Sequence, residues 1–223
     1  MGKGKLIVIE AGDGAGKATQ TALLYEKMSQ NGINVRRVSF PNYESPAAEP
    51  IKMYLRGDFG AHPGDVNPYA AATFYAVDRF ASYKRDWQNF YLSGGVILAD
   101  RYVTSNMAHQ AIKIGDADER QAFLTWLDDL EYKRLALPRP DLVLFLDMEP
   151  AAAQKLRQGR KEKVMGDIHE SDESYLVNCY AAYKELAERQ KWTSITCSRN
   201  GTALSAAEIH AAIYPVVQSV LSL

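Results

Sequence analysis

A glycine-rich segment followed by a lysine lies near the start of the chain, where residues 11–19 read Ala-Gly-Asp-Gly-Ala-Gly-Lys-Ala-Thr. Glycines let a backbone curl so that several N–H groups point at one anion. Lys17 adds a compact positive charge, and a helix that begins here adds the partial charge of its N-terminus. The segment is typical of a loop that binds nucleotide phosphates. The residues expected to line it are Gly12, Asp13, Gly14, Ala15, Gly16, Lys17, Ala18 and Thr19.

The flanking residues give this loop the context that a phosphate loop requires. It follows the apolar run Leu6–Ile9 and precedes an amphipathic stretch in which Leu24 and Met28 are one turn apart. Strand, loop and helix therefore come in the order of a P-loop. The alternative is a glycine-rich turn that binds no ligand. We weigh it below the P-loop because the Gly16-Lys17 pair is correctly placed after a buried strand.

Two residues depart from the usual P-loop pattern. Ala11 replaces the first glycine, and Ala18 replaces the serine or threonine whose hydroxyl normally reaches Mg²⁺. Thr19 is one residue further on, and helical geometry turns it by about 100°. We therefore expect Mg²⁺ to be held by water and by the nucleotide's own oxygens, with Asp13 or Asp100 as carboxylate anchors.

A second group of charged residues, Asp100-Arg101-Tyr102, directly follows the apolar run Val96–Ala99. Arginine suits bidentate binding of a phosphate because its planar guanidinium presents parallel N–H donors. The alternative is an ion pair at a strand end without a ligand. A phosphate-binding role for Arg101 is the favoured interpretation.

Five short apolar runs must position these residues. The first, third and fourth are continuously apolar, as strands buried on both faces of a parallel sheet are. Mostly helical stretches separate the runs, which indicates a doubly wound α/β fold in one domain spanning residues 1–223. In such folds ligands bind beyond the carboxyl ends of the strands, where the polar groups gather. The runs are Leu6–Ile9, Val35–Phe40, Val96–Ala99, Leu142–Leu146 and Thr193–Cys197.

The composition of the chain indicates which kinds of binding partner are unsupported. The 223-residue chain has a net charge of −1, so no global basic surface points to nucleic acid. Its two cysteines are too few for a disulfide scaffold or a metal quartet and fit free thiols in a reducing compartment. The first apolar run is too short for a signal peptide, and no stretch reaches transmembrane length. We expect a soluble, cytoplasmic protein with no membrane partner.

Further residues follow an order found in one enzyme family. They are Glu10 to Gln20, Phe40-Pro41, Asp78-Arg79, Asp100-Arg101-Tyr102 with Ser105, Ala108-x-Gln110, and Leu137-Pro138-x-Pro140-Asp141. In their order and spacing the chain resembles thymidylate kinases over most of its length. The resemblance implies a three-layer α/β/α P-loop fold with a five-stranded parallel sheet surrounded by helices. It also implies phosphoryl transfer from ATP to dTMP with Mg²⁺ as cofactor, and a homodimer.

The resemblance also implies a pocket for dTMP. Arg101 would bind the acceptor phosphate. Phe40 would pack against base and sugar, and Tyr75 would stack on the thymine. Arg79 would hydrogen-bond a thymine carbonyl, with Asn106 at the base edge; spacing of i and i+4 puts Tyr75 and Arg79 on one helix face. The expected dTMP-binding residues are Asp13, Phe40, Tyr43, Tyr75, Arg79, Arg101, Asn106 and His109.

Two pocket positions vary or depart from the family. Tyr43 stands where many members have arginine and others tyrosine, and its hydroxyl still offers a donor to phosphate. His109 replaces an aromatic residue, commonly tyrosine, close to the deoxyribose. Discrimination between sugars is the property that this second departure affects.

A basic segment follows the fourth apolar run. Residues 155–163 carry five basic residues and one acidic residue, and a run of this kind alone is often a solvated face. Thymidylate kinases take a catalytic arginine from the P-loop or from a lid, and this P-loop has none. By resemblance we expect a mobile lid at about residues 150–172, with Arg157 and Arg160 as unranked candidates. The expected catalytic set is Lys17, Asp13, Arg101, Arg157 and Arg160.

Two other functions stay open from the sequence. The first is a kinase for another nucleotide, deoxynucleotide or nucleoside, because the base pocket rests on resemblance. The second is a P-loop protein that binds nucleotides without catalysis, which the missing hydroxyl at Ala18 suggests. Lys17, Arg101 and the basic lid argue against the second.

Overall fold

The core of the molecule is a five-stranded sheet with strand order β2-β3-β1-β4-β5. The computed structural model describes residues 3–158 and 173–221, and in it every pair of neighbours in this sheet is parallel. The strands are β1 (Lys5–Glu10), β2 (Val35–Ser39), β3 (Val96–Asp100), β4 (Leu142–Asp147) and β5 (Thr193–Thr196). A small antiparallel hairpin, β6 (Ser198–Arg199) and β7 (Thr202–Ala203), follows.

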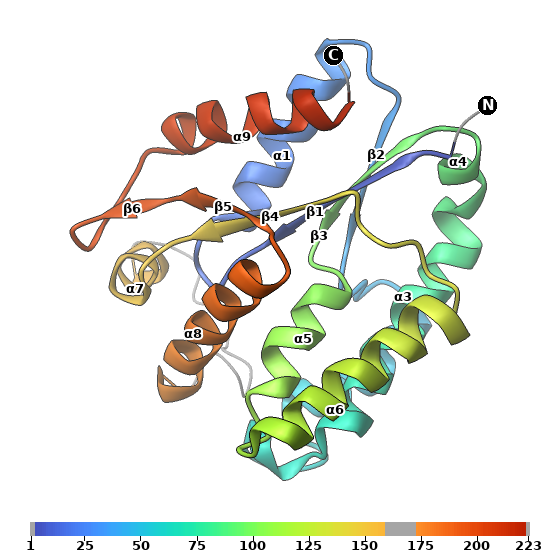
Figure 1. Cartoon of the computed structure of the whole chain (residues 1–223), viewed down its shortest axis with the longest axis vertical. Coiled ribbons are helices and arrows are strands. Elements are labelled where there is room, and N and C mark those ends of the chain that lie inside the picture. Colours follow the sequence, from blue (N-terminus) through green and yellow to red (C-terminus); the bar gives the residue numbers. More distant parts are fainter. Residues whose placement is uncertain (1–2, 159–172, 222–223) are drawn as a thin grey trace.

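Helices connect the strands and cover both faces of the sheet (Figure 1). They are α1 (Lys17–Gln30), α2 (Glu49–Arg56), α3 (Pro68–Ser82), α4 (Gln88–Leu92), α5 (Val103–Ala111), α6 (Ala117–Asp128), α7 (Pro150–Gln158), α8 (Glu173–Arg189) and α9 (Ala206–Leu221). Short 3-10 turns η1 (Pro46–Ala48) and η2 (Pro63–Asp65) and π segments η3 (Tyr83–Trp87) and η4 (Asp129–Arg134) complete the list. Of the helices within the described ranges, none combines the length and the apolar character needed to span a bilayer.

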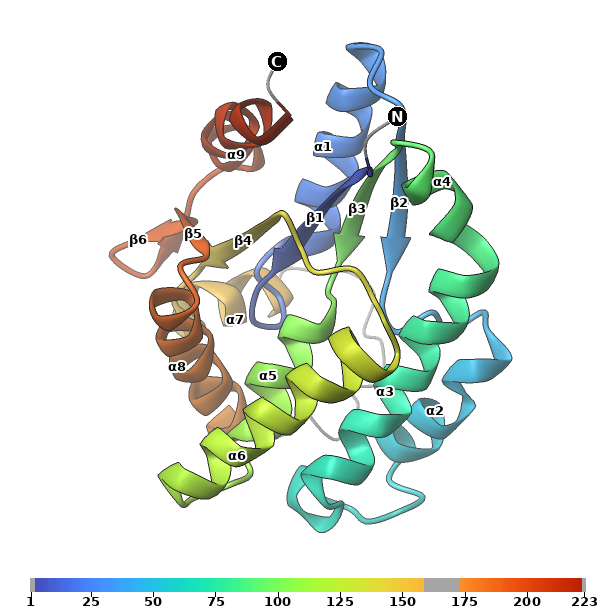
Figure 2. The ribbon, with the colours of Figure 1, turned by 45° about the vertical axis from the view of Figure 1, so that its right-hand side comes forward.

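The two faces of the sheet have separate cores because side chains alternate along each strand. Ile7 and Ile9 of β1 pack with Leu24 of α1 and Ile213 of α9 on one face. Leu6 and Val8 pack on the other face with residues of α5 and α8, among them Met107 and Tyr183. Figures 1 and 2 show the resulting three layers. The predicted three-layer α/β/α fold with five parallel strands is therefore confirmed.

Two strands end one residue before the predicted apolar run ends. β2 ends at Ser39 rather than at Phe40, and β5 ends at Thr196 rather than at Cys197. The Phe40 amide still donates to the Asp100 carbonyl at 3.0 Å, and Pro41 has no N–H with which to continue the ladder. β2 therefore ends next to Pro41.

The carboxyl ends of β1 and β3 meet at one edge of the sheet. Ile9 pairs with Asp100, and the Arg101 amide donates to the Ile9 carbonyl at 3.1 Å. Figure 2 shows α2 and α3 beyond the arrowheads of β2 and β3, so they face the same edge. The topology therefore gathers the P-loop, Asp100-Arg101 and α3 in one region.

An interior strand of the sheet, β3, supports a stability prediction. Leu98 of β3 is 0% exposed, whereas Leu92 at the end of α4 is 52% exposed. We expect Leu98→Ala to lower the free energy of unfolding by about 2–5 kcal/mol, because it leaves a cavity between the sheet and its helices. Leu92→Ala makes the same chemical change at the surface and should cost less than about 0.5 kcal/mol. Urea unfolding followed by circular dichroism measures both, and equal losses would contradict this account of the core.

Candidate active site

The P-loop joins β1 to α1 through a backbone that only glycine adopts easily. Gly14 and Gly16 both have φ of +83°, and Gly16 is the N-cap of α1 without a side-chain cap. The unpaired N–H groups of the first helical turn are therefore left for an anion. Ala18 and Thr19 are exposed on that turn, and the Thr21 hydroxyl donates to the Lys17 carbonyl at 2.9 Å. The hydroxyl of Thr21 is thus used within the helix.

Lys17 is held inside the loop. Its Nζ donates to the carbonyl oxygens of Ala11 at 3.0 Å and Gly12 at 3.2 Å, and lies 3.8 Å from Asp13 Oδ1. Burial lowers the pKa of Lys17, and the charge of Arg101 lowers it further, while the carboxylates of Asp13 and Asp100 act in the opposite sense. Two cations in a partly desolvated loop favour the arrival of an anion.

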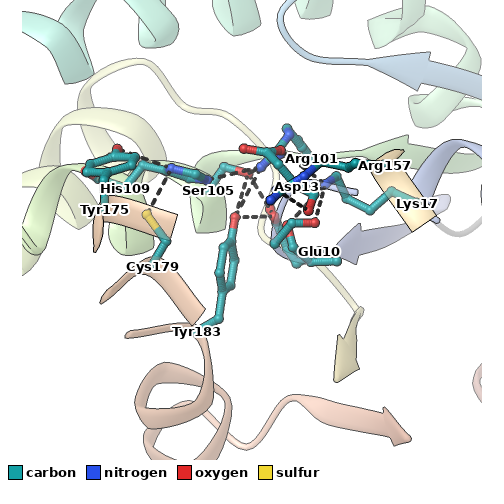
Figure 3. Close-up of polar contacts among 12 residues, drawn as sticks. Glu10, Asp13, Lys17, Arg101, Ser105, His109, Arg157, Tyr175, Cys179 and Tyr183 are labelled. Atoms are coloured by element: carbon teal, nitrogen blue, oxygen red, sulfur yellow. Dashed lines mark hydrogen bonds and ion pairs between the residues drawn. The ribbon is translucent and has the colours of Figure 1, made fainter. Parts of the chain in front are cut away.

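Arg101 lies at the centre of the site (Figure 3). Its Nη2 pairs with the Asp13 carboxylate. Its Nη1 lies 3.3 Å from Ser105 Oγ, 3.2 Å from His109 Nε2 and 3.2 Å from the Tyr183 hydroxyl. The backbone of Arg101 has φ of 66°, which is unusual for a residue with a side chain. The expected phosphate-binding arginine is thus fixed from several directions.

The Glu10 carboxylate accepts hydrogen bonds from residues around Arg101. Its side chain is fully buried and accepts from the Tyr102 amide at 3.1 Å and from the Thr104 hydroxyl at 2.5 Å. It also accepts from Ser105 Oγ at 2.7 Å and from the Tyr183 hydroxyl at 3.0 Å. The sequence alone predicts no role for Glu10. A carboxylate that directly ends a buried strand before a glycine loop is the signal that could have identified it.

One cavity beside Arg101 is lined by every residue predicted to bind dTMP: Asp13, Phe40, Tyr43, Tyr75, Arg79, Arg101, Asn106 and His109. Pro41, Leu55, Tyr102, Ser105 and Gln110 line it as well. The lining combines aromatic rings with guanidinium, amide and carboxylate groups. Such a cavity suits a planar base with a polar edge and an attached anion.

Arg79 and Asn106, which both line the cavity, share the buried carboxylate of Glu131 as a partner. Arg79 is held by Glu131 of η4, with a 2.8 Å bond from Nε to Oε2 and a second contact from Nη2 to Oε1. Asn106 Nδ2 donates to the Ala72 carbonyl at 3.1 Å and to Glu131 Oε1 at 3.3 Å. This leaves Arg79 Nη1 as a donor and Asn106 Oδ1 as an acceptor for a ligand. No local pattern marks Glu131, because it lies 52 positions from Arg79.

Arg157 of α7 reaches the P-loop, whereas Lys155 does not. Arg157 Nη1 donates to the Asp13 carbonyl at 3.2 Å, and a Cβ at Gly14 would lie 2.5 Å from Arg157 Cγ. Lys155 Nζ donates instead to the Gly201 carbonyl at 3.0 Å. Arg160 lies outside the described residues, as does the part of the expected lid (about residues 150–172) from residue 159 to residue 172.

Two carboxylates, those of Asp13 and Asp100, are the predicted anchors for Mg²⁺. Asp13 is paired with Arg101, and Asp100 is partly exposed at the end of β3. Among the described residues, no three His, Cys, Asp or Glu side chains form a metal-binding group. One or two carboxylates completed by water and by phosphate oxygens are the ordinary environment of Mg²⁺. Asp13 and Asp100 supply the carboxylate groups that such a site needs, and their part in binding Mg²⁺ stays a prediction.

The contact between Gly14 and Arg157 gives a prediction. Gly14→Ala adds left-handed strain and a methyl group where the Arg157 side chain lies, so it should displace Arg157 and lower kcat about tenfold or more. Gly32→Ala adds similar strain at φ of +75° with no atom within 4 Å, and should reduce stability without reducing kcat. Steady-state rates and thermal melts of both variants give the comparison. An undiminished loss from Gly14→Ala in the Arg157→Ala background would show that Arg157 does not carry the effect.

Comparison with known proteins places this site in a family. A sequence model described as thymidylate kinase matches residues 9–209. A thymidylate kinase of Mycobacterium tuberculosis (strain H37Rv) is 34% identical over 191 residues, covering 84% of this chain and 87% of that protein. One from Synechococcus sp. (strain WH7803) is 29% identical and covers 95% of this chain and 93% of its own. The match over most of the chain and the P-loop geometry agree: this chain belongs to the thymidylate kinase family.

Proposed function

We propose that this protein is a dTMP kinase, which transfers the terminal phosphoryl group of ATP to dTMP and so supplies dTDP for dTTP biosynthesis. The observation that carries the proposal is the position of Arg101. It borders the cavity for a base and lies beside Asp13 of the P-loop. A donor phosphate on the loop and an acceptor phosphate on Arg101 would therefore approach each other. Family membership supplies the identity of the acceptor.

ATP binds on the P-loop in this proposal. The backbone of residues 12–19 and the Lys17 ammonium contact its phosphates, because Lys17 already lies within the loop. Asp13 and Asp100 would hold Mg²⁺, partly through water, since Ala18 has no hydroxyl to offer. When bound, Mg²⁺ neutralises charge on the β and γ phosphates.

dTMP occupies the cavity on the other side of Arg101. Phe40 and Tyr75 pack against the base, and Phe40 is itself supported by Tyr102 with ring centroids 6.0 Å apart. Arg79 Nη1 donates to a thymine carbonyl, and Asn106 Oδ1 accepts from the ring N–H. Arg101 and the Tyr43 hydroxyl contact the monophosphate. His109 lies near the sugar.

Transfer is a direct in-line displacement. An oxygen of the dTMP phosphate forms a bond to the γ phosphorus while the bond from that phosphorus to the β–γ bridging oxygen breaks, and ADP leaves. The attacking oxygen is already ionised near neutral pH, so no strong general base is needed. Lys17, Arg157 and Arg160 stabilise the charge on the moving group. Arg157 has support from its contact with the Asp13 carbonyl.

The proposal extends to the state of the protein in the cell. We infer one domain with a lid at about residues 150–172, a cytoplasmic location, and no nucleic-acid or membrane partner. We also infer a homodimer, supported by an exposed apolar stripe on α3 that includes Val77 and Phe80. Light scattering at micromolar concentration tests the dimer, and a monomer mass would refute it.

A coupled assay of ADP formation tests the activity. dTMP, dUMP, dGMP, UMP and thymidine are compared as acceptors, each with and without Mg²⁺. We expect the highest kcat/KM with dTMP and loss of turnover without the metal. A higher value for another acceptor would identify a different nucleotide kinase. ATP binding without ADP formation on any acceptor would favour a non-catalytic nucleotide-binding protein.

The assigned cations give a further prediction. Lys17→Ala and Arg101→Ala should each lower kcat/KM for dTMP by about 100-fold or more, because each removes a charge that contacts phosphate. Arg134→Ala removes an exposed guanidinium that pairs with Asp129 and does not line the cavity, and it should leave the rate unchanged. Rates are measured after thermal melts show that each variant is folded. A Lys17 or Arg101 variant with near wild-type kcat/KM would refute the role assigned to that residue.

A further inference from the structure

His109 of α5 lies between Arg101 and α8 and is almost completely buried. Its Nε2 is 3.2 Å from Arg101 Nη1. Its Nδ1 is 3.3 Å from the Tyr175 hydroxyl and 3.4 Å from Cys179 Sγ, both on α8 (Figure 3). The ring therefore connects the phosphate-binding arginine to a helix that lies outside the P-loop and the cavity wall.

The neighbours of the ring determine which nitrogen carries the proton. A guanidinium has no acceptor, so Arg101 Nη1 must donate and His109 Nε2 must offer a lone pair. The Tyr175 hydroxyl donates its hydrogen to the His109 carbonyl at 3.1 Å, which leaves the Tyr175 oxygen to accept from Nδ1–H. Burial raises the pKa of Cys179 to about 12, so this neighbour is a neutral thiol and a weak acceptor.

The other proton arrangements conflict with these contacts. A proton on Nε2 would place an N–H donor against the Arg101 N–H at 3.2 Å. A doubly protonated ring would add repulsion between two cations at the same distance. The neutral tautomer with its proton on Nδ1 is the arrangement that fits the contacts with Arg101, Tyr175 and Cys179.

The two hydroxyl groups that face Arg101 Nη1 depend on Glu10, whereas Nη2 pairs with Asp13. Ser105 and Tyr183 donate their hydroxyl hydrogens to Glu10, so their oxygens are turned toward Nη1 as acceptors. His109 also faces Nη1, but its ring contacts Tyr175 and Cys179 instead of Glu10. It therefore adds a constraint on the guanidinium that Ser105 and Tyr183 do not supply.

We propose that His109 is a positioning residue that holds Arg101 in the orientation needed for the acceptor phosphate, and that Tyr175 fixes the tautomer that does so. The inference rests on the proposed function, since it assigns the phosphate contact to Arg101. It predicts that loss of the imidazole acceptor weakens the binding of dTMP and leaves the binding of ATP nearly unchanged.

The first test compares two substitutions of His109. His109→Leu keeps an apolar side chain of moderate size but removes the acceptor, and should raise KM for dTMP about tenfold with KM for ATP within about twofold. His109→Gln returns an acceptor, because Oε1 reaches toward the position of Nε2, and should restore KM for dTMP to within about threefold. Equal KM values for the two variants, or an equal rise in both substrates' KM, would overturn the proposal.

The second test is a double-mutant cycle through Tyr175. Tyr175→Phe removes the group that fixes the tautomer and should raise KM for dTMP about threefold in the wild-type background, with no further rise in the His109→Leu background. Tyr180→Phe is the matched control, because its hydroxyl lies on the same helix and donates to Asp147 at 2.7 Å. Equal effects of Tyr175→Phe in both backgrounds would refute the assigned role of Tyr175.

Measuring wild-type turnover first separates a failure of the proposed function from a failure of the inference about His109. If the wild-type protein does not phosphorylate dTMP, the proposed function is wrong. Calorimetric titration with dTMP then still decides the inference, since weaker binding by His109→Leu than by His109→Gln supports it. Equal binding by the two variants refutes it.

Discussion

The buried Glu10 carboxylate is the interaction on which the rest of the site depends. It ends β1 and accepts hydrogen bonds from the start of α5 and from Tyr183 of α8, so one group joins three elements. A buried carboxylate is costly unless its oxygens are satisfied, and here both accept two bonds. The same bonds orient the hydroxyls of Ser105 and Tyr183 toward Arg101. The strand end, the helix and Arg101 are thus fixed together.

The parts that could be predicted from the sequence are those with local signals. Continuous apolar runs indicate buried parallel strands, and a glycine loop followed by Lys17 indicates a phosphate site, because both depend on neighbours in the chain. The rule that ligands bind beyond the carboxyl ends of strands then places Arg101 beside the P-loop. Resemblance to a family added the residues of the cavity, which no spacing alone identifies.

The partners of those residues could not be predicted, because they are far apart in the chain. Glu131 meets Arg79 across 52 positions and Tyr175 meets His109 across 66, through the packing of helices on one face of the sheet. From the sequence alone, Arg79 and His109 are predicted only to face a ligand, and their protein partners are not. In the structure their polar atoms are largely engaged by protein. The contacts with Glu131 and Tyr175 decide which polar atoms of Arg79 and His109 remain available to a ligand.

The ion pair between Asp13 and Arg101 has a consequence for how quickly an anion is captured. Long-range attraction depends on net charge, and a guanidinium beside a carboxylate presents almost none at distances beyond a Debye length of about 8 Å. The pair therefore adds little to the long-range attraction of a phosphate, and the positive field at the loop comes from other cations such as Lys17 and Arg157. The charge of Arg101 acts on an anion mainly at short range, within the site. The pair thus bears more on how long an anion stays than on how fast it arrives.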